Sequence, residues 1–69
     1  MRKQLSIPQW RLLENHRLES EGQERRYFPR NRSQAGAWSC AYAALVRKGF
    51  IHQGQITDAG RKALEELAP

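Results

Sequence analysis

The sequence predicts a compact α+β domain built from three helices and one short two-stranded hairpin. Helix-start residues stand before two stretches with apolar residues at helical spacing. An alanine-rich stretch without charged residues ends at a glycine, and a Gln-Gly pair separates two short apolar stretches. A chain of 69 residues is the size of one small domain that buries about 60% of its unfolded surface. We therefore expect one domain over residues 1–69 with a small core.

The first helix is predicted over residues 7–19. Ser6 and Gln9 have the spacing of a capping box, and Pro8 lies in the first turn, where its missing N–H costs nothing. Gly22 ends the region. The residues expected to face the core recur at helical spacing and are Leu5, Leu12, Leu13 and His16.

Residues 24–32 read ERRYFPRNR and are predicted to be extended, because Pro29 interrupts any helix. Residues 25–28 have the composition of a short strand. Four arginines surround Tyr27 and Phe28 here: Arg25, Arg26, Arg30 and Arg32. The arginines are suited to phosphate and the aromatic rings to stacking on unpaired bases, whereas the alternative is buried aromatics beside solvated arginines. Our interpretation combines the two, with one aromatic buried and the arginines on an anion.

A second helix is predicted over residues 35–48, where alanine favours helix and Gly49 is the expected stop. Its apolar stripe is expected to turn inward and consists of Trp38, Tyr42, Leu45 and Val46. The outward positions are then Ser39, Cys40, Ala43 and Arg47. Nearly all of these outward side chains are small.

A hairpin over residues 50–57 is expected to turn at Gln53-Gly54. Thr57 is the expected N-cap of a last helix over residues 58–68, with Asp58 favourable in its first turn. The apolar face predicted for this helix consists of Ala59, Ala63, Leu64 and Leu67.

The net charge of +5 results from twelve Lys and Arg against seven Asp and Glu, and nine of the twelve are arginine. The arginine fork matches phosphate geometry, so a small basic domain of this composition favours a polyanionic partner, with nucleic acid the commonest. The alternative is that the charge only keeps the surface soluble.

Several function classes are not expected from this sequence. Cys40 is the only cysteine, which favours a reducing compartment, and no apolar stretch reaches the roughly 18 residues of a membrane span. The basic start at Met1–Lys3 is not followed by an apolar signal region, so we expect a cytoplasmic protein without a membrane partner. His16 and His52 lack metal-ligand spacing, and Cys40 lacks the partners of a nucleophile. We therefore expect no enzyme, no catalytic residues, no metal, no cofactor and no small-molecule substrate.

Two stretches, AALVRKGFI (43–51) and ITDAGRKALEEL (56–67), resemble the winged helix-turn-helix DNA-binding family of the small prokaryotic and phage type. LSIPQWRLLENH (5–16) is similar to the first helix of that family. The resemblance implies a winged-helix-like fold in which residues 35–48 form the recognition helix and residues 52–55 the wing tip. It further implies that the helix enters the major groove and the wing touches the DNA backbone. This chain departs from the pattern by replacing the preceding helix with ERRYFPRNR and by its short wing.

The first function hypothesis is a DNA-binding protein, such as a small phage or bacterial transcription regulator. The expected phosphate ligands are Arg25, Arg26, Arg30, Arg32, Arg47 and Lys48. Ser33, Gln34 and Ser39 are expected near base edges, and Gln53 and Gln55 serve the wing.

The second hypothesis is a protein-binding inhibitor or adaptor on the same scaffold, such as an anti-CRISPR-type phage protein that blocks a host nucleic-acid machine. The uncharged helix face favours this reading, and the net charge favours DNA, with RNA as a third possibility. A homodimer fits the DNA reading, because half-site pairing suits the fold. The residues of the expected partner surface are Trp10, Ser39, Cys40 and Ala43. For Trp10, packing beside the core with Leu13 is the alternative.

Overall fold

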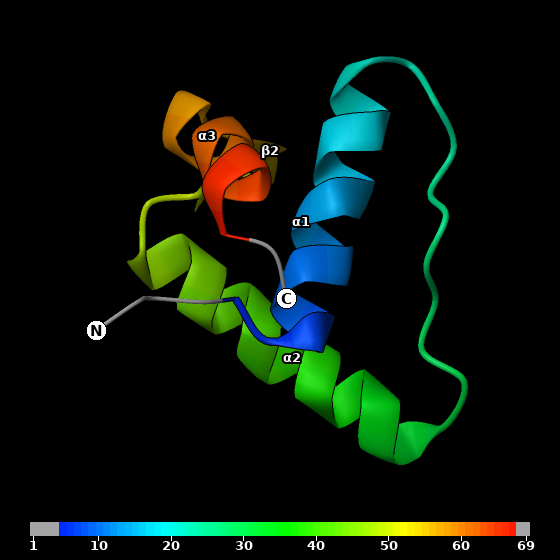
Figure 1. Cartoon of the computed structure of the whole chain (residues 1–69). Coiled ribbons are helices and arrows are strands. Elements are labelled where there is room, and N and C mark those ends of the chain that lie inside the picture. Colours follow the sequence, from blue (N-terminus) through cyan, green and yellow to red (C-terminus); the bar gives the residue numbers. More distant parts are fainter. Residues whose placement is uncertain (1–4, 68–69) are drawn as a thin grey trace.

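The computed structural model describes residues 5–67, which form three helices and a two-stranded antiparallel sheet. In chain order these are α1 (Ile7–Ser20), α2 (Arg32–Arg47), β1 (Ile51–His52), β2 (Gln55–Ile56) and α3 (Asp58–Glu66). The predicted α+β class, with three helices and a hairpin, is confirmed. Helix α1 crosses α2, and α3 lies on one side of α1 (Figure 1). Residues 23–31, hereafter the extended segment, run along the other side of α1 (Figure 1).

The first and last helices begin where their capping residues predict. Ser6 Oγ accepts a hydrogen bond from the Gln9 N–H at 3.3 Å, and Gln9 Oε1 accepts one from the Ser6 N–H at 3.1 Å. This is the expected capping box. At α3, Thr57 Oγ1 accepts a hydrogen bond from the Gly60 N–H at 3.1 Å. Helix α3 ends at Glu66 and Leu67 is its C-cap, so the predicted end is wrong at position 67, and the predicted position 68 lies outside the described residues.

Helix α2 begins at Arg32, three residues earlier than predicted, because Asn31 is a strong N-cap. The Asn31 side-chain oxygen accepts a hydrogen bond from the Gln34 N–H at 2.9 Å. The helix ends at Arg47, with Lys48 as its C-cap, and Gly49 follows with a φ of +80°. The expected glycine stop is thus confirmed.

The strand predicted over residues 25–28 is wrong, because the extended segment pairs with a side chain instead of with another strand. Asn15 Oδ1 accepts hydrogen bonds from the N–H groups of Arg26 and Tyr27, both at 3.0 Å. Asn15 Nδ2 donates to the Tyr27 carbonyl at 2.7 Å. These three hydrogen bonds are hereafter called the Asn15 clamp. Asn15 is the only buried polar residue among residues 5–67, and the clamp gives its side-chain oxygen and nitrogen hydrogen-bond partners.

The hairpin confirms the predicted turn. Ile51 pairs with Ile56 and His52 with Gln55, and both turn residues, Gln53 and Gly54, have positive φ. Positive φ at both central positions is the geometry of a type I′ turn.

The core lies where α1, α2, the hairpin and α3 meet. Its buried cluster comprises Leu5, Leu13, Leu45, Ile51 and Ala63. Partly buried side chains pack around this cluster: Trp10, Leu12, Phe50, Ile56, Leu64 and Leu67. On α3 the predicted apolar face needs one correction, because Ala59 is exposed and Gly60 is buried beside the hairpin.

The predicted inward stripe of α2 is wrong at two positions. Tyr42 is 37% exposed and Val46 is 45% exposed, whereas Ala41 and Leu45 are buried. In a helix so rich in alanine, apolar residues lie on every side, so the large side chains of Tyr42 and Val46 were no guide to the side of the helix that is buried.

Among the helices of residues 5–67, none has the length and apolar character needed to cross a membrane.

Candidate nucleic-acid interface

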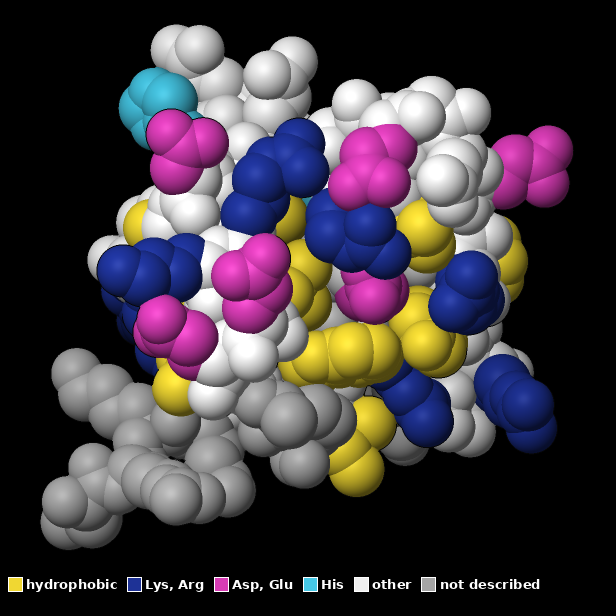
Figure 2. Space-filling model, turned by 45° about the horizontal axis from the view of Figure 1, so that its top comes forward, with side chains coloured by type: hydrophobic (Ala, Val, Ile, Leu, Met, Phe, Trp, Pro, Cys, Tyr) yellow, Lys and Arg dark blue, Asp and Glu magenta, His cyan; other side chains and the backbone are white. Residues whose placement is uncertain are grey.

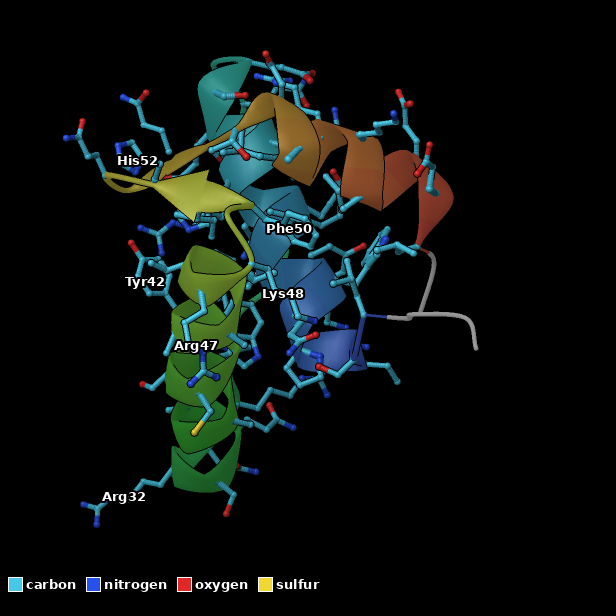
Figure 3. The ribbon with its side chains drawn as sticks, turned by 90° about the vertical axis from the view of Figure 1, so that its left-hand side faces the viewer. Arg32, Tyr42, Arg47, Lys48, Phe50 and His52 are labelled. Carbon is cyan, nitrogen blue, oxygen red and sulfur yellow. The ribbon has the colours of Figure 1, made fainter. Side chains whose placement is uncertain are left out.

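The cations predicted to bind phosphate divide between two surfaces. Arg32 and Arg47 lie at the two ends of α2, and Arg26 and Arg30 lie on the extended segment. Figure 1 places the extended segment on the side of α1 away from α3, whereas Figure 3 views the molecule from the opposite side, toward which Arg47 projects. Arg47 therefore lies on a different surface from Arg26 and Arg30, whereas Arg32 lies at the end of α2 that the extended segment joins.

The first surface is the exposed side of α2, hereafter the open face. Its side chains are small between two terminal arginines, and its residues are Arg32, Gly36, Ser39, Cys40, Ala43 and Arg47. All six are exposed, and a Cβ added at Gly36 would meet nothing within 4 Å. In Figure 3 Arg47 projects from this helix and Arg32 lies at its far end. Lys48, also predicted to bind phosphate, leaves α2 on a different side from Arg47 (Figure 3).

Ser33 and Gln34, predicted to lie near base edges, are in the first turn of α2 and not in the middle of the open face, where Ser39 lies. Gln34 Oε1 accepts a hydrogen bond from the Arg30 N–H at 2.7 Å, which turns the Gln34 side chain back toward the extended segment. Ser33 is exposed in the first turn. Ser39 is therefore the one hydroxyl in the middle of the open face.

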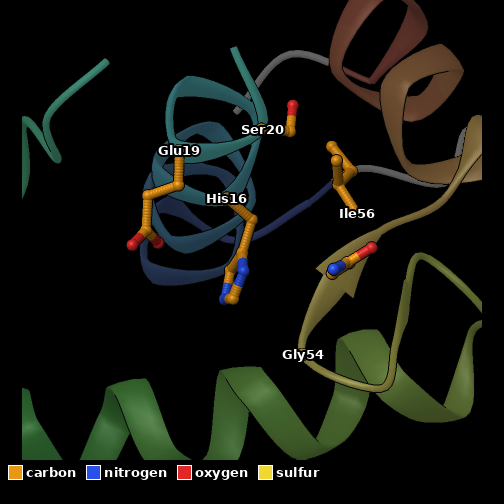
Figure 4. Close-up of a pocket in the computed structure, with 6 residues that line it drawn as sticks. His16, Glu19, Ser20, Gly54 and Ile56 are labelled. Carbon is orange, nitrogen blue, oxygen red and sulfur yellow. The ribbon is translucent and has the colours of Figure 1, made fainter. Parts of the chain in front are cut away.

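The hairpin carries the predicted wing residues Gln53 and Gln55, both exposed, beside His52. Each strand has two residues, and the turn lies next to the C-terminal half of α1 (Figure 4). Between them is a hollow of about 420 Å³ lined by His16, Glu19, Ser20, Gly54, Gln55 and Ile56. Among residues 5–67, the lining of this hollow includes no Lys or Arg, so the hollow does not extend a phosphate-binding surface.

His16 lies in that hollow and is half-buried, as expected for a residue at the edge of the core. Its ring lies against that of Tyr42, with centroids 5.9 Å apart. Burial lowers the pKa of His16 below its ordinary value of 6.5, and the nearby Glu19 carboxylate and Gly54 backbone offset this only in part. His16 is therefore uncharged at neutral pH.

The second surface is an open hollow of about 370 Å³ formed by α1 and the extended segment, hereafter the Arg–aromatic hollow. It is lined by Arg11, Arg26, Tyr27, Phe28, Pro29 and Arg30. Tyr27 is half-buried and meets Trp10 edge-on, with ring centroids 5.9 Å apart. The Arg11 guanidinium lies 5.6 Å from the centre of the Tyr27 ring. Phe28 is 63% exposed and Tyr27 is partly covered, so neither ring is fully buried, whereas our interpretation expected one buried aromatic. An anion on the arginines stays a prediction.

Two residues proposed from the sequence have partners within the fold. Arg25 forms an ion pair with Glu19 at 3.4 Å. Within residues 5–67 its guanidinium therefore already has an acidic partner, unlike those of Arg26 and Arg30. Trp10 is half-buried and packs against the core, as the alternative reading of this residue held.

The acidic residues lie on α1, in the four residues after it, and on α3. Arg17 forms ion pairs with Glu14 and Glu21, and the hydrogen bond to Glu14 raises the pKa of Arg17 above its ordinary value. Arg61 of α3 also approaches Glu21, at 3.6 Å. Acidic and basic side chains alternate over the face that the C-terminal half of α1 shares with α3 (Figure 2). In contrast, residues 25–57 contain six Lys and Arg and no Asp or Glu.

Three features of these surfaces were missed in the sequence. Residues 25–57 contain no Asp or Glu, which could have been counted in the sequence and which indicates where positive charge is concentrated. Arg11 joins the Arg–aromatic hollow across the fold, and Asn15 holds the extended segment through backbone groups 11 and 12 residues further along the chain. No local pattern marks either residue.

Comparisons with protein families, with curated proteins and with solved structures give no match for this chain.

Proposed function

We propose that this chain is a cytoplasmic, non-enzymatic protein that binds duplex DNA with the open face of α2. The observation that carries the proposal is the charge distribution. Six cations and no carboxylate lie in residues 25–57, and all seven acidic residues lie in residues 14–24 and 58–66. Two of the six, Arg32 and Arg47, lie on the open face itself, which has no carboxylate, and such a surface attracts a polyanion.

The shape of α2 supports groove binding. Its 16 residues span about 24 Å, and the major groove, about 12 Å wide, admits a helix. Small side chains at Gly36, Ser39 and Ala43 let the helix backbone approach base edges closely. Arg32 and Arg47 are separated by about 22 Å along the axis, at the rise of about 1.5 Å per residue, so each reaches phosphates at one end of the helix.

The N-terminal turn of α2 adds to this attraction. It contains Arg32 and no acidic residue, so the positive end of the helix dipole and the guanidinium favour an anion together. Because Ser39 is the one polar side chain in the middle of the open face, phosphate contacts supply most of the affinity and sequence preference is weak.

Titration of labelled mixed-sequence duplex DNA with the full chain, followed by fluorescence anisotropy at several salt concentrations, tests the proposal. We expect binding at low salt that weakens linearly in log–log form, with a slope of about −2 for the two phosphates that Arg32 and Arg47 contact. Arg47→Ala should flatten the slope by about one unit. Lys62→Ala, an exposed cation of α3, is the matched control and should leave the slope near the wild-type value. Absence of duplex binding at low salt would overturn the proposal.

A protein-docking role is the second candidate, because the open face between its two arginines is uncharged and made of small residues. Such a surface also fits closely against a helix of a partner protein. Ser39→Trp and Ala43→Arg block close approach in either case. If they abolish biological activity while Arg47→Ala leaves it unchanged, the open face binds a protein and not DNA.

A further inference from the structure

The Arg–aromatic hollow shares no residue with the open face and has a chemistry of its own. We propose that it binds single-stranded nucleic acid, with an unpaired base stacked on Phe28 and the flanking phosphates on Arg11, Arg26 and Arg30. This site goes beyond the duplex binding proposed for α2 and does not depend on it.

The backbone on both sides of Phe28 is held in place. Before it, the Asn15 side chain makes three hydrogen bonds to the backbone of Arg26 and Tyr27. After it, the Arg30 N–H donates to Gln34 Oε1 of α2 at 2.7 Å. The segment is therefore ordered before a ligand arrives, which lowers the entropy lost on binding.

The two neighbouring aromatics have different roles. Tyr27 is occupied within the fold, since Trp10 meets it edge-on at 5.9 Å and the Arg11 guanidinium lies 5.6 Å from its centre. Phe28 is 63% exposed and sits beside the rigid ring of Pro29. A large apolar ring held at the surface next to a hollow offers a platform for another flat ring.

The charges around Phe28 are suited to phosphate. Arg11, Arg26 and Arg30 are exposed and form no ion pair with any of residues 5–67, whereas Arg25 next to them is paired with Glu19. All three line the hollow of about 370 Å³, within the range of about 300–1,000 Å³ typical of small-ligand sites. Guanidinium groups bind phosphate oxygens through paired hydrogen bonds.

Together these features favour a single strand over a duplex. Interior bases of a duplex are stacked on both neighbours, so away from a duplex end Phe28 can stack only on a base that is unpaired. Phosphate binding alone would engage the three arginines and leave the exposed ring without a role.

Anisotropy titration of the full chain with a fluorescein-labelled oligothymidylate tests the site, with the labelled duplex measured in parallel. Phe28→Ala should weaken oligothymidylate binding about 5- to 100-fold and leave duplex binding unchanged. Phe28→Tyr keeps a stacking ring and should stay within about two-fold of wild type, whereas Phe28→Leu should behave like Phe28→Ala. Arg26→Ala and Arg30→Ala should each reduce the salt slope by about 0.7, the value for one phosphate of a single strand.

The control variants separate this site from the open face. Arg47→Ala should weaken duplex binding and leave oligothymidylate binding unchanged, and Lys62→Ala should change neither. The proposal is overturned if oligothymidylate does not bind at low salt, whatever the duplex does. It is also overturned if Phe28→Ala leaves oligothymidylate binding intact or weakens both nucleic acids equally. Circular dichroism of each variant confirms that its fold is retained.

Discussion

Asn15 binds both backbone groups of Tyr27. Its Oδ1 accepts from the Tyr27 N–H at 3.0 Å, and its Nδ2 donates to the Tyr27 carbonyl at 2.7 Å. This is the hydrogen-bond pattern that a neighbouring strand would provide, supplied here by one buried side chain of α1. The extended segment thereby keeps a fixed path without belonging to a sheet.

Asn15→Leu preserves the approximate volume and removes all three hydrogen bonds to residues 26 and 27. We expect the free energy of unfolding to fall by about 1–3 kcal/mol, because partly buried backbone groups lose their partners. Urea denaturation measures the loss, and trypsin should cleave after Arg25 or Arg26 faster than in wild type. The exposed Gln23→Ala is the control. An Asn15→Leu protein as stable and protease-resistant as wild type would show that the clamp does not hold the segment.

Gly60→Ala should destabilise the fold because α3 lies close against the hairpin. A Cβ at position 60 would meet the Phe50 carbonyl oxygen and lie 2.8 Å from Ile56 Cγ1. Overpacking of this kind costs about 1–3 kcal/mol, which a thermal melt detects. Gly36→Ala is the matched control, because its added methyl meets nothing within 4 Å and alanine favours helix by about 1 kcal/mol. The two substitutions should therefore shift the melting temperature in opposite directions.

His16 should make stability depend on pH below neutrality. Burial lowers its pKa in the folded state, so the unfolded chain, with a pKa near 6.5, binds more protons as the pH falls. The free energy of unfolding should then decrease as the pH drops below about 6.5 and level off once folded His16 is also protonated. Denaturation at a series of pH values tests this. His16→Gln should flatten the profile in that window, and an unchanged profile would show that His16 is not the cause.

Gln53→Asn should stabilise the hairpin. Gln53 has a φ of +53°, a left-handed conformation that asparagine adopts more readily than glutamine. We expect a gain of about 0.5–1 kcal/mol in urea denaturation. Gln55→Asn, which makes the same chemical change in β2, is the control. Equal effects of the two substitutions would mean that the turn conformation is not the cause.

The parts of the fold that local chemistry determines were predictable. The Ser6 capping box, the Thr57 N-cap and the Gln53-Gly54 turn each depend on residues within a few positions, and all three are confirmed. The class and order of elements depend on these boundaries, so they were predictable too.

The parts that depend on contacts between distant elements were not predictable. The buried side of α2 was misjudged at Tyr42 and Val46, because alanine-rich helices have no strong apolar contrast between faces. Asn15 is polar and its partners are backbone groups, so its burial leaves no mark in the apolar pattern. The separation of Arg26 and Arg30 from Arg47 likewise depends on the path of the extended segment around α1.

The reactivity of Cys40 can be used to measure whether the open face is covered by a bound partner. It is the single cysteine of the chain, it is exposed, and it lies near the middle of α2 between Ser39 and Ala41. A thiol-reactive dye therefore attaches at one place without any engineered mutation. The rate at which that dye reacts becomes a footprint: whatever covers α2 slows the alkylation, and whatever binds only at Phe28 leaves it unchanged.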